Sequence, residues 1–228
     1  LDYINDLKPA PFFISISAEY EEGLTTLNYQ DKMQFAIDIT LNQSGFPLTT
    51  AEIRSSPLVI DLDNDGEKEI IIGDYNGIIH VLNYDGSAYE TIFFPFDTGD
   101  AIWGSPSGAD LDRDGLMDFV ITSKSKHLYI FDRNGLKTEY MTELNDADST
   151  GVYLIATPAL GNLDNDEDLE VVFSGYSRNN KVFAINHDGS NVDGFPFELG
   201  EKVKAGVALA DFNNNGRDDI VIGTDDHH

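Results

Sequence analysis

Four short acidic loops recur along the chain in a common register, and they constrain the fold more than any other feature. Each loop spans nine residues, with Asp or Asn at positions one, three and five and Asp or Glu at position nine. The loops begin at residues 61, 110, 162 and 211, so successive loops are 49, 52 and 49 residues apart. A fixed period of about 50 residues is typical of architectures in which each repeat is one supersecondary unit.

Features outside the acidic loops keep the same period. Pro57, Pro106 and Pro158 each lie four residues before position one of the first three loops. A short β-branched run follows every loop, and in three copies a second apolar run ends in Asp-Gly or Asn-Gly. Such runs and dipeptides predict strands joined by tight turns. The sequence therefore predicts an all-β fold, a β-propeller of four-stranded blades of about 50 residues each.

The repeats predict a propeller over residues 45–228, with units at about 45–93, 94–146, 147–193 and an incomplete 194–228. Residues 1–44 fit the period less well. The segment 35–38 before Gly45-Phe46-Pro47 resembles 183–186 before Gly194-Phe195-Pro196, which favours a degenerate preceding blade. The alternation from Met33 to Leu41 instead favours a β-sandwich remnant. We expect a partial arc of a longer propeller, or a four-bladed ring that Met33 to Leu41 closes.

The residue types in the loops are those that calcium prefers. Ca²⁺ takes about six to eight oxygen ligands, and alternate acidic residues in a tight loop supply them. An EF-hand begins similarly, but it needs Glu at position twelve, where these loops have Ile72, Ile121, Phe173 and Ile222. The sequence predicts up to four structural Ca²⁺ sites. Their ligands are the side chains at positions one, three, five and nine and the carbonyl at position seven: Asp61, Asp63, Asp65, Glu67 and Glu69; Asp110, Asp112, Asp114, Leu116 and Asp118; Asn162, Asp164, Asp166, Asp168 and Glu170; Asp211, Asn213, Asn215, Arg217 and Asp219.

The four predicted sites differ in negative charge. Side-chain carboxylates among the ligands number four in the first and second loops, three in the third and two in the fourth. Since the carboxylate count sets the field on the ion, we expect the fourth site to bind calcium most weakly.

Composition restricts the partners of the chain. With 14 Lys and Arg against 41 Asp and Glu, the formal net charge is −27. Such a surface repels phosphate backbones and anionic lipids, so we expect no nucleic-acid partner. No apolar run approaches the length that spans a bilayer, which argues against direct membrane insertion. The 41% of hydrophobic residues can form a core, and the absence of cysteine excludes a disulfide scaffold.

The pattern Asp-x-Asp-x-Asp-Gly-x-x-Asp/Glu, preceded by Ser-Pro or Thr-Pro and followed by an Ile/Val-rich strand, resembles the FG-GAP/VCBS repeats of integrin-α-like β-propellers. The resemblance covers about residues 45–223. It implies a seven- or eight-bladed propeller with Ca²⁺ in loops between strands, in adhesion or binding proteins or as noncatalytic parts of secreted enzymes. The literal Phe-Gly and Gly-Ala-Pro signatures are missing, and Asn162, Glu167, Asn213 and Asn215 depart from the loop pattern.

No residue pattern predicts catalysis. Gly104-Ser-Pro-Ser-Gly108 has Pro106 where a nucleophile elbow requires Ser, and the histidines lie in or beside strand-like runs. We expect a noncatalytic, secreted or cell-surface calcium-binding module for adhesion or ligand binding.

An unidentified extracellular protein or glycan is the expected ligand, and further propeller blades of the same polypeptide are possible partners. The alternatives are an accessory propeller of a secreted peptidase or polysaccharide lyase or hydrolase, with its catalytic domain in further sequence, and a structural spacer of a surface assembly. Trp103 and the tyrosines outside the strands could stack on sugar rings, although scattered aromatic residues more often serve blade packing.

Overall fold

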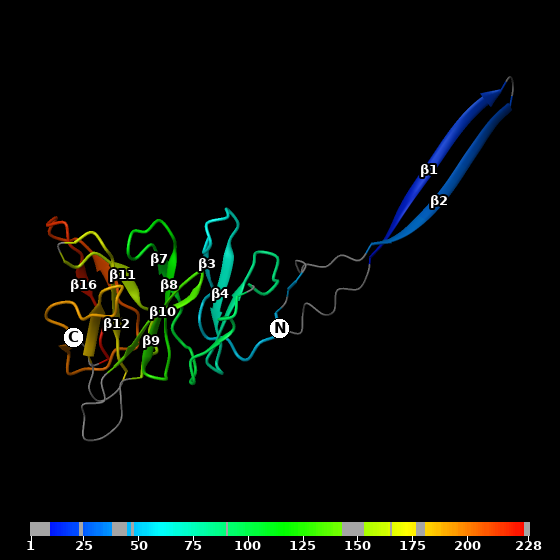
Figure 1. Cartoon of the computed structure of the whole chain (residues 1–228). Coiled ribbons are helices and arrows are strands. Elements are labelled where there is room, and N and C mark those ends of the chain that lie inside the picture. The colour runs from blue at the N-terminus through cyan, green and yellow to red at the C-terminus, as the bar shows by residue number, and fades with distance from the viewer. Residues whose placement is uncertain are drawn as a thin grey trace. The chain divides into compact units, whose positions relative to one another are not determined.

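The computed structural model describes residues 10–22, 25–37, 45–46, 48–89, 91–142, 153–164, 166–176 and 181–225 (Figure 1). All elements in these ranges are strands, so the predicted all-β class is confirmed. The described part of the chain contains no helix with the length and hydrophobicity needed to cross a bilayer. The chain divides into two compact units, Leu1–Pro47 and Leu48–His228.

The first unit contains one antiparallel pair of strands, β1 (Ala10–Glu22) and β2 (Thr25–Ile37). Their register places Ala10 opposite Ile37 and Glu22 opposite Thr25. The four-bladed ring that Met33 to Leu41 would close stays a prediction. Whether residues 1–44 are a degenerate blade or a sandwich remnant stays a prediction, and residues 38–44 lie outside the described ranges.

Within its described residues, the second unit contains three four-stranded antiparallel sheets and one two-stranded sheet, one for each acidic loop. In each sheet the strands follow one another in sequence order, as in a propeller blade. The first blade contains β3 (Leu58–Ile60), β4 (Glu69–Gly73), β5 (Ile78–Leu82) and β6 (Phe96–Asp97). The second contains β7 (Ser107–Ala109), β8 (Asp118–Thr122), β9 (His127–Asp132) and β10 (Gly135–Met141). The third contains β11 (Ala159–Gly161), β12 (Glu170–Ser174), β13 (Lys181–Ile185) and β14 (Phe197–Glu198), and the half-blade contains β15 (Ala208–Ala210) and β16 (Asp219–Val221).

The apolar runs form the second strand of each sheet in the second unit, and in the second and third blades both faces of that strand are covered. In β8, Phe119 and Ile121 pack in the cluster shared with the first blade, whereas Val120 packs in the cluster shared with the third blade. All three side chains are fully buried. A strand covered on both faces requires a continuous apolar run rather than an alternating one, which is the pattern that the sequence shows.

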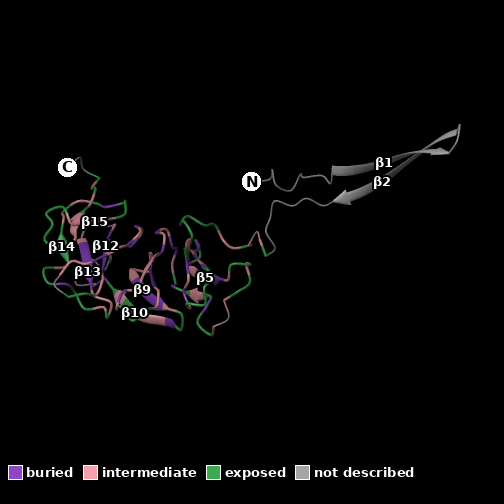
Figure 2. Ribbon diagram, turned by 90° about the horizontal axis from the view of Figure 1, so that it is seen from above, coloured by how far each residue is buried: buried purple, intermediate pink, exposed green. Residues whose placement is uncertain are grey.

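The hydrophobic core lies between adjacent blades. One cluster joins the first and second blades, another joins the second and third, and a third joins the third blade to the half-blade. Figure 2 shows buried residues along the strands and exposed residues in the connecting loops. The largest fully buried side chains include Phe119, Phe131 and Phe173, and the rings of Phe119 and Phe131 stack with centroids 4.9 Å apart. Each blade therefore depends on its neighbour for its core.

Polar contacts also join the blades at the Ser-Pro and Thr-Pro dipeptides. Ser105 Oγ accepts a hydrogen bond from the Ser56 amide at 2.8 Å, and Thr157 Oγ1 accepts one from the Ser105 amide at 3.0 Å. The first strand of each blade contacts the first strand of the next, β3 with β7, β7 with β11 and β11 with β15. The periodic hydroxyl before proline therefore links neighbouring blades along their first strands.

Candidate metal-binding loops

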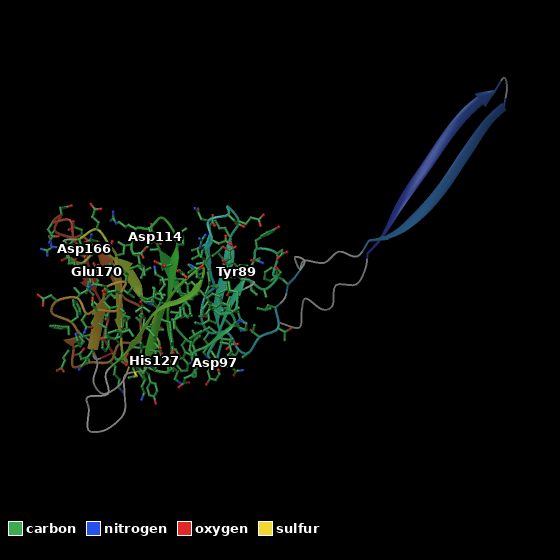
Figure 3. All side chains as sticks on the ribbon, viewed as in Figure 1. Tyr89, Asp97, Asp114, His127, Asp166 and Glu170 are labelled. Carbon is green, nitrogen blue, oxygen red and sulfur yellow. The ribbon has the colours of Figure 1, made fainter. Side chains whose placement is uncertain are left out.

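Each acidic loop connects the first and second strands of a blade. Because antiparallel strands alternate in direction, all of these loops leave their blades at the same end. Figure 3 shows Asp114, Asp166 and Glu170 at this end, and His127 and Asp97 at the other. The repeat thus brings four acidic loops to one end of the second unit.

Hydrogen bonds from the backbone hold the acidic side chains in place. Positions three and five accept bonds from amides two residues ahead, for example Asp65 Oδ1 from the Glu67 amide at 2.7 Å. Position six is glycine in three loops, with φ between 85° and 94°, a conformation that L-residues rarely adopt. In these three loops its amide donates to the position-one carboxylate at 2.8–3.1 Å: Gly66 to Asp61, Gly115 to Asp110 and Gly216 to Asp211.

The position-nine carboxylate is anchored in the same way in all four loops. One of its oxygens accepts a hydrogen bond from the amide at position two: Glu69 from Leu62, Asp118 from Leu111, Glu170 from Leu163 and Asp219 from Phe212. Glu69, Asp118 and Glu170 are at most 2% exposed. The sequence therefore buries a carboxylate at the start of the second strand in the first three blades, and in the third loop its other oxygen, Glu170 Oε1, accepts no hydrogen bond.

Three of the loops gather carboxylates closely enough to hold a metal ion. Within each group, ligand oxygens from three side chains lie within 4.8 Å of one another. The groups are Asp61, Asp63 and Glu69; Asp110, Asp112 and Asp114; and Asp164, Asp166 and Glu170. Asp65 and Asp118, which the sequence also predicts as ligands, lie outside these groups. The fourth loop, with only two carboxylates among its predicted ligands, forms no such group in the described residues.

A buried oxygen atom without a hydrogen-bond partner is a group that a bound cation could satisfy. Asp110 Oδ1, Asn162 Oδ1 and Glu170 Oε1 are buried and accept no hydrogen bond. A buried unsatisfied oxygen costs roughly 1–3 kcal/mol, and more when it carries charge. All three atoms belong to residues predicted as ligands at position one or nine. The residues of the second and third loops therefore fit a cation that would satisfy these oxygens.

The second loop contains a cation from the protein itself. Lys137 Nζ donates to Asp112 Oδ2 and to Asp118 Oδ1, both at 2.9 Å. Burial lowers the pKa of Lys137, but these two hydrogen bonds outweigh it and raise the pKa to about 12. Asp118 is therefore engaged by lysine, which differs from the four-carboxylate site predicted from the sequence. Lys137 lies in β10, 19 residues beyond Asp118, so loop spacing alone could not have identified it.

The fourth loop satisfies its own carboxylates. Asp211 accepts bonds from the amides of Asn215 and Gly216, and the backbone bond from Gly216 is the main cause that lowers its pKa. Asn213 Nδ2 lies 3.3 Å from both oxygens of Asp219. Asn213 and Asn215 replace two carboxylates, so this loop has less charge with which to attract an ion.

Burial raises the pKa of the position-nine glutamates. For Glu69, burial is the largest cause, the hydrogen bond from Leu62 opposes it, and repulsion from Asp63, Asp65 and Asp61 adds to it. For Glu170, burial again comes first, the bond from Leu163 opposes it, and Asp164 and Asp166 raise the pKa further. A divalent cation would remove this repulsion.

The carbonyls predicted at position seven belong to Glu67, Leu116, Asp168 and Arg217, and their role as ligands stays a prediction.

A further contact of the first loop was not predicted from the sequence. Burial and the nearby Asp63 carboxylate raise the pKa of Tyr89 to about 12, and the tyrosine hydrogen-bonds to Asp63. Tyr89 comes from the segment after β5, just as Lys137 comes from the segment after β9. The edge of a blade therefore supplies a side chain to its own acidic loop.

The sequence profile of the FG-GAP-like repeat family matches the chain three times, over residues 61–121, 110–173 and 162–222. Each match begins at position one of an acidic loop and runs through the second strand of the next blade. No curated protein matches the sequence.

Two solved structures share the fold at 12% sequence identity. The crystal structure of BBS1N in complex with ARL6DN, soaked with lead, has a TM-score of 0.54 at 12% identity, covering 74% of this chain and 49% of that one. The mercury-soaked form gives 0.52 at 12% identity, covering 71% and 48%. The Pseudomonas aeruginosa PilY1 C-terminal domain gives 0.46 at 21% identity, covering 67% and 35%. The chain spans about half the length of the BBS1N structures that it matches.

Proposed function

Because the chain belongs to the FG-GAP-like repeat family, we propose that residues 45–228 form a noncatalytic, calcium-stabilised propeller module that serves adhesion or ligand binding outside the cell. The observation that carries this proposal is the set of three carboxylate groups at equivalent positions of three blades, with buried unsatisfied oxygens in two of these loops. These groups lie between strands, where an ion would hold the first and second strands of a blade together.

Calcium suits these loops better than magnesium. The ligands are carboxylate, amide and carbonyl oxygens that the loop itself supplies, and Ca²⁺ accepts many such ligands in flexible geometry. Mg²⁺ instead keeps several waters and rarely occupies a cage made only of protein. Glu69 and Glu170 would ligate through the oxygen that the backbone bond leaves available. The ion would supply charge compensation to buried carboxylates.

An extracellular location agrees with this chemistry. Extracellular calcium modules bind with dissociation constants of about 10⁻⁴–10⁻³ M, so exposed loops such as these fill in millimolar calcium. Arrays of matrix proteins and glycans, probed with and without EDTA, test the binding role. Turnover of a polysaccharide or peptide by this chain alone would contradict the noncatalytic assignment.

Isothermal titration calorimetry of the whole chain tests the calcium sites directly. We expect three sites that bind Ca²⁺ more tightly than any fourth. The variant Glu170→Gln should lose one of these sites, because a neutral amide replaces the buried carboxylate of the third loop. The matched control Glu198→Gln changes an exposed residue of β14 and should keep all three. Absence of calcium binding at millimolar concentration, or the same stoichiometry in both variants, would refute the proposal.

A further inference from the structure

Several basic residues lie at the end of the blades opposite the acidic loops. Five of the 14 Lys and Arg residues of this acidic chain lie there: Arg54, Lys124, Lys126, Lys202 and Lys204. Four aromatic rings accompany them: Tyr75, Trp103, Tyr153 and Tyr176. We call these nine residues the cation–aromatic row.

Contacts between cations and rings make the row continuous over the first three blades. The Arg54 guanidinium lies 4.7 Å from the Tyr75 ring centroid and 4.6 Å from that of Trp103. Lys124 Nζ lies 4.9 Å from the Trp103 ring and 5.8 Å from the Tyr153 ring. Lys126 Nζ is 6.0 Å from Tyr153. Cations and rings therefore alternate along this part of the row.

The row continues to the half-blade. Tyr153 and Tyr176 are joined by a backbone bridge, and Lys202 and Lys204 lie 5.6 Å and 5.7 Å from the Tyr176 ring. The row follows from the repeat, because the same backbone bond recurs in every copy. In each copy, the backbone amide of a residue just after the second strand donates to a backbone carbonyl in the segment before the first strand. The pairs are Tyr75 to Glu52, Lys124 to Ala101, Tyr176 to Tyr153 and Asp225 to Lys202.

The chain neutralises only part of this positive charge. Glu52 pairs with Arg54 at 2.8 Å, and Asp225 pairs with Lys204 at 2.6 Å. Within the described ranges, Lys124, Lys126 and Lys202 form no ion pair, although acidic residues outnumber basic ones almost threefold in the chain. Among the described residues, three ammonium groups thus lie beside aromatic rings without an ion-pair partner.

Two of the four rings, those of Tyr75 and Tyr153, are more exposed than the aromatic residues of the core. Tyr75 is 40% exposed and Tyr153 is 42% exposed, whereas the core aromatic residues Phe119 and Phe131 are fully buried. An exposed ring offers an apolar face to a ligand, and the cation beside it offers charge. A ligand that matches this alternation is a chain of similar units, each of which has an apolar face and a carboxylate.

We propose that the cation–aromatic row binds an acidic polysaccharide that contains uronate units. Each uronate couples a C–H face, which stacks on an aromatic ring, to a carboxylate, which pairs with a lysine or arginine. The inference rests on the proposed binding module and names the class of its ligand. The negative charge of the rest of the chain repels an acidic ligand, but salt screens this repulsion over about 8 Å at physiological ionic strength. A ligand that lies against the row is therefore influenced mainly by the nearby cations.

Fluorescence anisotropy with a labelled hyaluronan oligosaccharide tests the proposal in saturating calcium. We expect saturable binding that weakens with salt and is lost when the uronate carboxyls of the probe are reduced to alcohols. The double variant Lys124→Gln/Lys126→Gln should weaken binding by about tenfold, since two charge contacts are removed. Tyr153→Leu should weaken binding although it keeps the charge.

The control Lys68→Gln/Arg113→Gln removes the same charge from exposed loop positions that are not predicted ligands, and it should bind as the wild type does. Circular dichroism establishes that each variant is folded. Equal binding by the carboxyl-reduced probe, unchanged affinity in the double variant, or tighter binding of poly-glutamate than of hyaluronan would each overturn the assignment. These outcomes leave calcium stabilisation intact, so they are distinct from failure of the proposed function.

Discussion

The position-nine carboxylate links the fold of each acidic loop to its chemistry. One oxygen accepts the position-two amide, so the side chain is fixed before an ion binds. Burial keeps this carboxylate from being solvated, and neighbouring aspartates repel it, so the pKa of Glu69 and Glu170 is raised. In the second loop, the ammonium group of Lys137 compensates the charge of the buried Asp118 carboxylate.

Replacing Lys137 with methionine should destabilise the protein mainly when calcium is absent. The change leaves Asp118, 2% exposed, without its cation, and breaking a buried pair in this way costs on the order of 3 kcal/mol. Bound calcium should restore most of the loss. Urea unfolding of Lys137→Met in EDTA and in calcium measures this. The control Lys181→Met removes an exposed pair with Glu198 and should change stability by less than about 1 kcal/mol in either condition. A loss for Lys137→Met that calcium leaves unchanged would contradict the role given to the lysine.

The raised pKa values predict opposite pH dependences with and without calcium. A carboxyl whose pKa is higher in the folded state than its ordinary 4.5 binds more protons when folded. The stabilising contribution is therefore present below 4.5 and is lost as the pH rises through the folded pKa. In EDTA the melting temperature should fall as the pH rises from about 4.5 toward neutrality. In saturating calcium it should rise, because the ligands must be deprotonated to bind. The variant Glu69→Gln/Glu170→Gln should reduce both slopes, and unchanged slopes would count against these two residues.

At the scale of elements, the blade is the repeating unit and the blade junction is where stability is shared. Apolar clusters span each junction, and the Ser-Pro and Thr-Pro dipeptides add hydrogen bonds between neighbouring first strands. The fourth copy has Gly206-Val207 at these positions and so lacks the hydroxyl.

Thr157→Val should weaken the junction of the second and third blades. Valine keeps the shape of threonine but leaves the Ser105 amide without its acceptor, which costs about 1–2 kcal/mol. Equilibrium unfolding in saturating calcium measures the loss. The same substitution at the exposed Thr49 should change the free energy of unfolding by less than about 0.5 kcal/mol. Equal effects at the two positions would show that the junction hydrogen bond contributes nothing.

The elements that could be predicted from the sequence are those whose causes are local. Runs such as Phe119-Val120-Ile121 predict a strand that is covered on both faces, and Asp85-Gly86 predicts the turn that follows β5 in the first blade. The acidic loops are equally local. Lys137 and the cation–aromatic row could not be predicted, because their contacts join distant segments. Arg54 and Trp103 are 49 residues apart in the sequence and meet only when two blades pack.

At the scale of the whole molecule, charge connects the acidic loops to stability. Three divalent cations would add six positive charges to the formal net charge of −27 and give −21. Because an excess of one charge opposes the compact state, ion binding stabilises the fold both within the loops and over the whole molecule. The cation–aromatic row, which lies at the opposite end of the blades, keeps its positive charge available for a ligand.

Thermal unfolding of the whole chain in EDTA, in a calcium titration and in a magnesium control tests the central claim most directly. An ion that binds only the folded state raises the melting temperature in proportion to the logarithm of its concentration once its sites are saturated. The carboxylate groups predict a large rise with calcium and a much smaller one with magnesium at the same ionic strength. No rise in millimolar calcium, or an equal rise with magnesium, would mean that the acidic loops are turns rather than calcium sites.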